Sequence, residues 1–272
     1  MRRALSIVVG SVVAGLLSVA GAPQEPVARQ TWRIDGVERM ALVASPGAPV
    51  PAAGSPLVFV FHGHGGTAQH SARTFDIHSR WPTAVVVYAQ GLPTPGRLTD
   101  PEGQRPGWQH APGDQNDRDL KFVDAMLSWA RARFRIDPAR VFAAGHSNGG
   151  TMTYVLWVAR GPTFAAFAPS ASVFRRDLIG GARPKPALII AGEKDELVPF
   201  SAQRAGLEAT LRLNRAGATG RPWSGRYTTL YVSSIGADVV AYVHSGDHTM
   251  PADAGAMMVK FFDELGNRGL GR

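Results

Sequence analysis

Along most of this chain, short uninterrupted apolar runs take turns with segments whose apolar positions recur at helical spacing. Residues 57–61 and 84–88 are apolar without interruption, which is typical of strands buried on both faces of a parallel sheet. Asp119 is placed to cap a helix that runs to about Arg135. The apolar side chains of that segment recur at helical spacing and form one stripe, made of Leu120, Val123, Leu127, Ala130 and Phe134.

The same alternation continues to the end of the chain. Further strands are predicted at residues 141–144, 164–168, 187–191 and 239–243, and helices after Ser147, at 201–215 and at 252–265. Residues 32–43 alternate around Asp35-Gly36, a hairpin dipeptide, between an irregular lead-in at 23–30 and a loop at 45–56. Strand and helix alternating over roughly 200 residues predicts a doubly wound, mostly parallel α/β sheet in one domain, residues 23–272.

Composition narrows the classes of protein that this pattern allows. The 272 residues are 44% hydrophobic and 18% charged, which suits a packed core and excludes a disordered, charge-dominated chain. The absence of cysteine excludes disulfides, thiol catalysis and zinc–thiolate sites. The net charge is +8, but the basic residues are scattered, with no basic run and no interleaving of aromatic and basic residues. We therefore expect no nucleic-acid partner.

The first 22 residues differ from the rest. Arg2 and Arg3 are followed by an uncharged apolar run at residues 4–20, and Ala20-Gly21-Ala22 offers small residues for cleavage. This layout predicts a secretory signal peptide at residues 1–22, with an uncleaved anchor as the alternative. We expect a secreted, periplasmic or cell-envelope protein that is not inserted in the membrane after cleavage and is a monomer.

A candidate nucleophile lies between a predicted strand and a predicted helix. Residues 145–149 read G-H-S-N-G, and the strand–motif–helix order is the setting of a nucleophile elbow, with Ser147 as the attacking residue. The alternative is a glycine-rich turn in which Ser147 only caps the helix. Upstream, residues 62–66 (H-G-H-G-G) follow the strand at 57–61, where such a fold places a second oxyanion donor. The backbone N–H groups of Asn148 and His64 are the two expected donors. A metal site at His62, His64 and His70 is disfavoured, because no carboxylate accompanies them at a ligand spacing.

A serine nucleophile needs a base and an orienting acid, in the chain order serine, acid, histidine. Only His244 and His248 follow Ser147. His248 is favoured because it lies in a loop before the last helix, whereas His244 ends an apolar strand. The acid should follow the strand at 187–191, where Glu193, Asp195 and Glu196 crowd and spacing does not choose among them. Asp247 is interpreted as a loop-capping residue.

These segments together resemble the secreted polyhydroxybutyrate depolymerase and feruloyl esterase group of α/β-hydrolases, the lineage of the LpqC-type esterases. The resemblance runs from about Trp32 to Phe262. It is carried by residues 60–66 (VFHGHGG), 88–92 (YAQGL), 107–109 (GWQ), 136–150 (IDPARVFAAGHSNGG), 164–169 (FAAFAP), 191–199 (AGEKDELVP) and 246–251 (GDHTMP).

The resemblance implies an α/β-hydrolase fold, selects Asp195 as the acid and supports His248 as the base. Met250 stands where relatives usually have a tryptophan. Several relatives have a disulfide that this chain, which lacks cysteine, cannot form. Trp108 and Met250 are candidate substrate-binding residues, with a packed loop anchor as the alternative for Trp108.

The combined expectation is a serine esterase without metal or organic cofactor. Its expected substrates are hydroxyalkanoate polyesters or oligomers, or hydroxycinnamate esters on polysaccharide. Two alternatives stay open. One is an acyltransferase with the same triad, which the resemblance to mycobacterial exported proteins suggests. The other is a non-catalytic cell-surface binding protein on a hydrolase scaffold.

Overall fold

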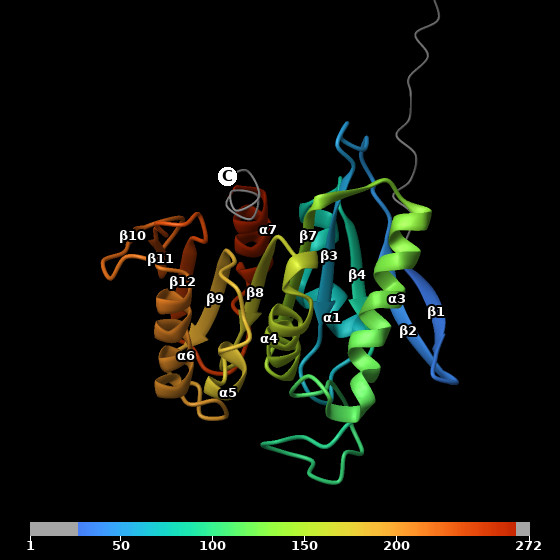
Figure 1. The fold of residues 1–272 in the computed structure, drawn as a ribbon, viewed down its shortest axis with the longest axis horizontal. Coiled ribbons are helices and arrows are strands. Elements are labelled where there is room, and N and C mark those ends of the chain that lie inside the picture. The colour runs from blue at the N-terminus through green and yellow to red at the C-terminus, as the bar shows by residue number, and fades with distance from the viewer. Residues whose placement is uncertain (1–26, 265–272) are drawn as a thin grey trace, which may run out of the picture.

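A ten-stranded sheet forms the centre of the computed structural model, which describes residues 27–264 (Figure 1). The predicted signal peptide, residues 1–22, lies outside the described residues. Six central strands follow the order β4-β3-β7-β8-β9-β12 and pair in parallel. Their bounds are β3 (Ser55–Phe61), β4 (Val85–Ala89), β7 (Ile136–His146), β8 (Ala166–Ser170), β9 (Ala187–Gly192) and β12 (Val239–His244).

Antiparallel strands extend both edges of this parallel centre. On one side β2 (Val37–Ala44) pairs with β4 and with β1 (Ala28–Ile34), and on the other β11 (Thr228–Tyr231) joins β12 to β10 (Arg221–Pro222). Two further short strands, β5 (Leu92–Pro93) and β6 (Pro106–Gly107), pair only with each other. The β5–β6 pair closes a long loop, which reaches the site described below.

Helices cover both faces of the sheet, as the doubly wound prediction requires (Figure 1). One face packs under α1 (Ala68–Phe75), α2 (Ile77–Arg80) and α7 (Ala254–Glu264), with Val58 and Val60 of β3 directed into that layer. The other face packs under α3 (Arg118–Arg133), α4 (Asn148–Arg160), α5 (Arg176–Ile179) and α6 (Phe200–Leu213) and receives Phe59 and Phe61. Alternate residues of one strand thus enter two separate apolar layers, because successive side chains point to opposite faces.

The sequence reading of the elements is confirmed in outline and wrong at two points. The lead-in predicted at residues 23–30 is partly strand, because Ala28 already pairs with Val43 in β1–β2. Asp119 does not cap α3. It is fully buried in the first turn and accepts hydrogen bonds from Arg39 at 2.8 Å and from the Gln109 backbone N–H at 2.8 Å. A charge without solvent needs such partners, so Asp119 anchors the loop before α3 to β2.

The parallel strands bring their carboxyl ends to one edge of the sheet. The segments that follow β3, β7, β9 and β12 carry His64, Ser147, Asp195 and His248 respectively. Open α/β sheets bind ligands at this edge. Among residues 27–264, no helix is both long and apolar enough to cross a bilayer.

Candidate active site

Ser147 occupies a sharp turn between β7 and α4. Its backbone has φ 56° and ψ −120°, a conformation that is unfavourable for a residue with a side chain. Its N–H donates to the Ser170 carbonyl at 2.8 Å, and its carbonyl accepts from Thr151 at 3.0 Å. These bonds on both sides of the turn hold the strained residue at the point where the strand ends and the helix begins.

The glycines of the motif are required by close approach of the backbone. A Cβ at Gly145 would lie 2.2 Å from the Gly149 carbonyl oxygen. A Cβ at Gly149 would lie 2.1 Å from the carbonyl oxygen of Phe61 in β3. Any side chain at either position would therefore push α4 away from the sheet and open the turn.

His248 lies in the loop after β12 and joins Ser147 to Asp195. Its Nε2 accepts the Ser147 hydroxyl at 2.8 Å, and its Nδ1–H donates to Oδ2 of Asp195 at 2.8 Å. His244, the other histidine of this region, is buried at the end of β12 and accepts the Gly246 backbone N–H at 3.2 Å. Thus the structure brings together Ser147, Asp195 and His248, and leaves His244 outside the group.

Asp195 is buried and held by three donors besides His248. The backbone N–H groups of Leu197 and Val198 donate to Oδ1 at 3.0 and 2.8 Å, and Gln203 Nε2 of α6 donates to Oδ2 at 2.9 Å. Glu193 and Glu196, the two other acidic candidates, are exposed. These donors fix the orientation of the carboxylate toward the imidazole.

His146 packs against the His248 ring, with ring centroids 5.0 Å apart. Burial, together with the neighbouring His248, lowers the pKa of His146 to about 4. Its ring is therefore neutral at physiological pH and adds no positive charge beside His248. The motif at residues 145–149 does not indicate this contact, because His248 is 102 positions away and only the tertiary fold brings the two rings together.

The two expected oxyanion donors flank Ser147. Gly63 approaches the elbow closely enough that a Cβ there would lie 3.4 Å from the Ser147 Cβ, and His64 follows it in the chain. Within residues 27–264, neither the Asn148 N–H nor the His64 N–H has an acceptor. Both residues line the same pocket as Ser147. Two free N–H groups beside a nucleophile are what a developing oxyanion needs.

Trp108 and Met250 do not occupy the positions expected of substrate-binding residues. Trp108 is fully buried, donates its Nε1–H to the His62 carbonyl at 2.8 Å and packs on Phe61. Its backbone N–H also donates to Asn148 Oδ1 at 2.7 Å, so it anchors the elbow rather than contacting a substrate. Met250 is half-buried against the apolar layer under α7 and does not line the pocket. For Trp108 the structure gives the alternative interpretation, a packed loop anchor. For Met250 substrate contact stays a prediction.

The histidines of the H-G-H-G-G segment serve different partners. His62 donates through Nδ1 to Gly63 and accepts the Gly91 N–H at Nε2 at 2.9 Å, and burial lowers its pKa to about 4. His64 Nε2 lies 2.9 Å from Oδ2 of Asp100, in the loop between β5 and β6. His70 contacts Thr74 on α1. No group of three potential metal ligands converges in the described part of the chain.

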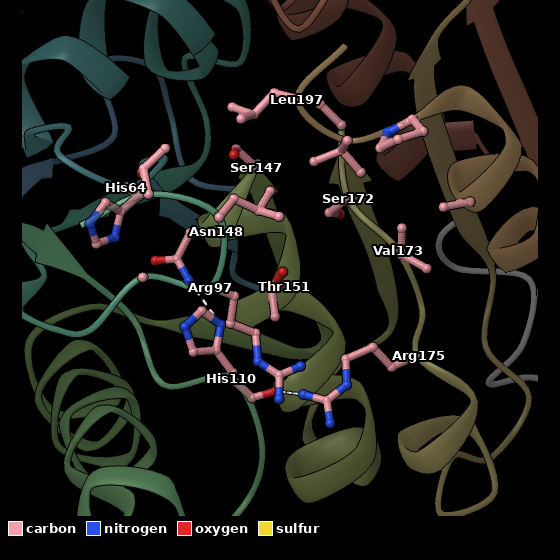
Figure 2. A pocket seen from close by; sticks show the side chains of 17 residues that line it. His64, Arg97, His110, Ser147, Asn148, Thr151, Ser172, Val173, Arg175 and Leu197 are labelled. Atoms are coloured by element: carbon pink, nitrogen blue, oxygen red, sulfur yellow. Dashed lines mark hydrogen bonds between the residues drawn. The ribbon is translucent and has the colours of Figure 1, made fainter. Parts of the chain in front are cut away.

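A pocket of about 280 Å³ opens in front of Ser147 (Figure 2). It is formed by the loop between β5 and β6, by the start of α4, and by the segments after β8 and β9. Figure 2 shows His64 and Asn148 on one side, Leu197 at one end, and Arg97 and Arg175 toward the other end. No sequence motif indicated the two arginines or Gln203, because long segments of chain separate them from the motifs.

Comparisons with known proteins agree with this architecture. The model of the prolyl oligopeptidase family matches residues 107–180, which include Ser147 but end before Asp195 and His248. The chain is 32% identical over 170 residues to a protein named as an esterase, NocK, of Nocardia uniformis; the match covers 58% of this chain and 45% of that one. It is 30% identical over 145 residues to a protein named as a feruloyl esterase C of Aspergillus clavatus, covering 53% and 50%.

The chain spans about half the length of these curated relatives. Among solved structures, an acetyl xylan esterase of Aspergillus awamori superposes with a TM-score of 0.63 at 13% identity, covering 87% of this chain and 99% of that one. At this identity the likeness concerns the fold alone. The protein has the α/β-hydrolase fold, as the sequence motifs predicted. Its elbow serine, histidine and buried aspartate form one hydrogen-bonded line at the carboxyl edge of the sheet.

Proposed function

We propose that this protein is a serine ester hydrolase in which Ser147, His248 and Asp195 act as a catalytic triad. The observation that carries the proposal is the unbroken chain of 2.8 Å hydrogen bonds from Asp195 through His248 to a strained elbow serine at the base of a pocket. The similarity to proteins named as esterases supports the same reaction class.

The reaction follows from this arrangement. Ser147 Oγ attacks the ester carbonyl carbon while His248 Nε2 takes the hydroxyl proton, and the N–H groups of Asn148 and His64 donate to the carbonyl oxygen as it becomes an oxyanion. The C–O bond to the alcohol then breaks, and His248 returns the proton to the leaving oxygen. Water, deprotonated by His248, then attacks the acyl-serine carbonyl; the bond to Ser147 Oγ breaks, His248 returns the proton to that oxygen, and the acid is released.

Two substrate classes fit the sequence motifs. Relatives named as feruloyl esterases favour hydroxycinnamate esters, and the motif resemblance favours hydroxyalkanoate polyesters or oligomers as well. An acyltransferase would use the same groups, with an alcohol in place of water at the second step. A non-catalytic binding protein would have no need for a strained serine aligned with a histidine. We also propose export through residues 1–22, with residues 23–272 as a single monomeric domain.

The test compares the purified protein with Ser147→Ala on a chromogenic short-chain ester, a methyl hydroxycinnamate and soluble hydroxybutyrate oligomers. The proposal predicts turnover that is lost in the variant, and the ranking of substrates chooses the class. An added sugar acceptor that becomes acylated would identify the transferase. Turnover no faster than that of Ser147→Ala on every ester would overturn the hydrolase.

A further inference from the structure

Two arginines from segments that are far apart in the sequence line one end of the pocket. Arg97 lies in the loop between β5 and β6, and Arg175 lies just before α5. Figure 2 shows their guanidinium groups at the same end of the pocket, away from Leu197 and near His110. Burial lowers the pKa of His110, and the charges of Arg97 and Arg175 lower it further, because both guanidinium groups lie near this ring.

The two cations differ in how they are compensated. Arg175 forms an ion pair with Asp177 and donates to the His110 carbonyl at 3.4 Å, so its position is fixed. Arg97 forms no hydrogen bond or ion pair with any described residue. Its field reaches Asp177, whose pKa is lowered by the Arg175 hydrogen bond first and by Arg97 further. A guanidinium at the mouth of a pocket, with its donors free, is available to a ligand.

The other charged groups near this end do not cancel Arg97. Asp177 is already paired, and Asp114 accepts the His110 backbone N–H at 3.2 Å. Neither is among the described residues that line the pocket, and that lining contains no Asp or Glu. His110 is neutral at physiological pH, since its pKa is lowered. The rest of the lining is largely apolar, as at Leu98, Val173 and Val198.

We propose that this end of the pocket is a carboxylate subsite, so that the preferred esters carry a second, negatively charged carboxylate. The inference rests on the proposed function and specifies its substrate class. The planar guanidinium fork of Arg97 would bind the two carboxylate oxygens, with Arg175 beside it, while the apolar lining holds the chain that links the carboxylate to the ester. The carboxylate belongs to either the acyl part or the alcohol part of the ester.

The experiment compares matched pairs of charged and neutral esters. Monomethyl adipate and methyl hexanoate differ only in a carboxylate or a methyl group at the end of the acyl chain. The dimer of 3-hydroxybutyrate and its methyl ester differ in a free or blocked carboxylate on the alcohol side. The ratio of kcat/KM for the charged ester to that for the neutral one is measured at low ionic strength, because salt screens an exposed cation.

The subsite predicts a ratio that falls about tenfold in Arg97→Gln for at least one pair, the loss of one charge-assisted, two-point contact. Arg97→Lys keeps the charge without the fork, so its charged-to-neutral ratio should lie between the ratio of the unaltered protein and that of Arg97→Gln. Arg176→Gln is the matched control, because Arg176 is exposed, adjacent to Arg175 and outside this pocket. Its ratio should equal that of the unaltered protein. The pair that responds tells whether the carboxylate lies on the acyl or the alcohol side.

Failure of the subsite and failure of the proposed function give different results. If the neutral esters are hydrolysed by the protein and not by Ser147→Ala, the hydrolase stands. In that case a charged-to-neutral ratio that is unaffected by Arg97→Gln in both pairs overturns the subsite. If none of the four esters is hydrolysed faster than by Ser147→Ala, the proposed function itself fails.

Discussion

Two histidine–aspartate pairs lie near Ser147, and only one has the geometry of a catalytic base. His248 and Asp195 are 2.8 Å apart, and His64 and Asp100 are 2.9 Å apart. The free nitrogen of the first pair, His248 Nε2, faces the Ser147 hydroxyl. The free nitrogen of the second, His64 Nδ1, is buried against Gly107, where a Cβ would lie 2.7 Å away, and it has no hydrogen-bond partner among residues 27–264.

The aspartates of the two pairs differ in the elements that hold them. Each aspartate accepts two backbone N–H groups, those of Leu197 and Val198 at Asp195 and those of Gln104 and Arg105 at Asp100. Asp195 is completely enclosed and also accepts a side-chain donor from α6, whereas the Asp100 side chain, 7% exposed, lies in the loop between β5 and β6. Asp100 thus organises the loop that ends at β6 and, through His64, links this loop to residues 62–66, which follow β3. A histidine–carboxylate distance does not by itself identify a base; what the other imidazole nitrogen faces decides the role.

The largest predicted difference is between the two histidines. His248→Ala should lower kcat on a chromogenic ester by about 10⁵-fold or more, because the serine loses its base. His64→Ala should lower kcat by about tenfold or less, because the variant keeps the backbone N–H that we propose as an oxyanion donor. Initial rates of the two variants, with circular dichroism as the folding control, measure the comparison. Equal losses in the two variants would contradict the assignment.

A smaller contrast is predicted for the two aspartates. Asp195→Asn should lower kcat about 10⁴-fold, since the amide no longer fixes the tautomer that His248 needs. Asp100→Asn loosens the loop between β5 and β6, so we expect a change of about tenfold that falls mainly on KM. Steady-state kinetics of both variants on one ester separates kcat from KM. A large kcat loss in Asp100→Asn would show that the second pair takes part in the chemistry.

The smallest predicted effect is on stability, through the neutral histidines beside each pair. His62 and His146 have pKa values of about 4, below the ordinary value of 6.5, so the unfolded chain binds more protons between these limits. The contribution of these two histidines to the free energy of unfolding is therefore fully present above pH 6.5 and is lost as the pH falls toward 4. From pH 7 to pH 5 each histidine should lower the free energy of unfolding by about 2 kcal/mol.

Urea unfolding at both pH values measures this loss, and His62→Gln should remove its share of the pH dependence while lowering stability at pH 7. A free energy of unfolding that does not change between pH 7 and pH 5 would mean that the two rings are not held neutral by burial.

The elements of the fold could be predicted because they depend on local pattern. The apolar runs of β3 and β4 and the stripe of α3 follow from period alone, and Asp35-Gly36 adopts the positive φ values that its hairpin requires. Asp119 illustrates the limit of this reading. An acidic residue before an apolar stripe predicts a cap, but its partner Arg39 lies 80 residues away and only the folded chain brings it there.

The site divides in the same way. The motif and the chain order indicated Ser147 and His248. Glu193, Asp195 and Glu196 are equivalent by spacing; the family resemblance selected Asp195, and the fold distinguishes it by its burial and its hydrogen bond to His248. Trp108 in a glycine-rich loop has the same local sequence whether it faces a substrate or the core, and its contacts with Phe61 and His62 decide for the core. Arg97 and Arg175 carry no motif, so their common pocket appears only in three dimensions.

The central claim, that Ser147 is the nucleophile activated by His248, is tested most directly by covalent labelling. The purified protein is treated with a fluorophosphonate, and intact mass with peptide mapping locates the product. The account predicts one phosphonyl group per chain on Ser147, no label on Ser147→Ala, and strongly slowed labelling of His248→Ala. Label on another residue, or equal labelling of the protein and Ser147→Ala, would contradict it.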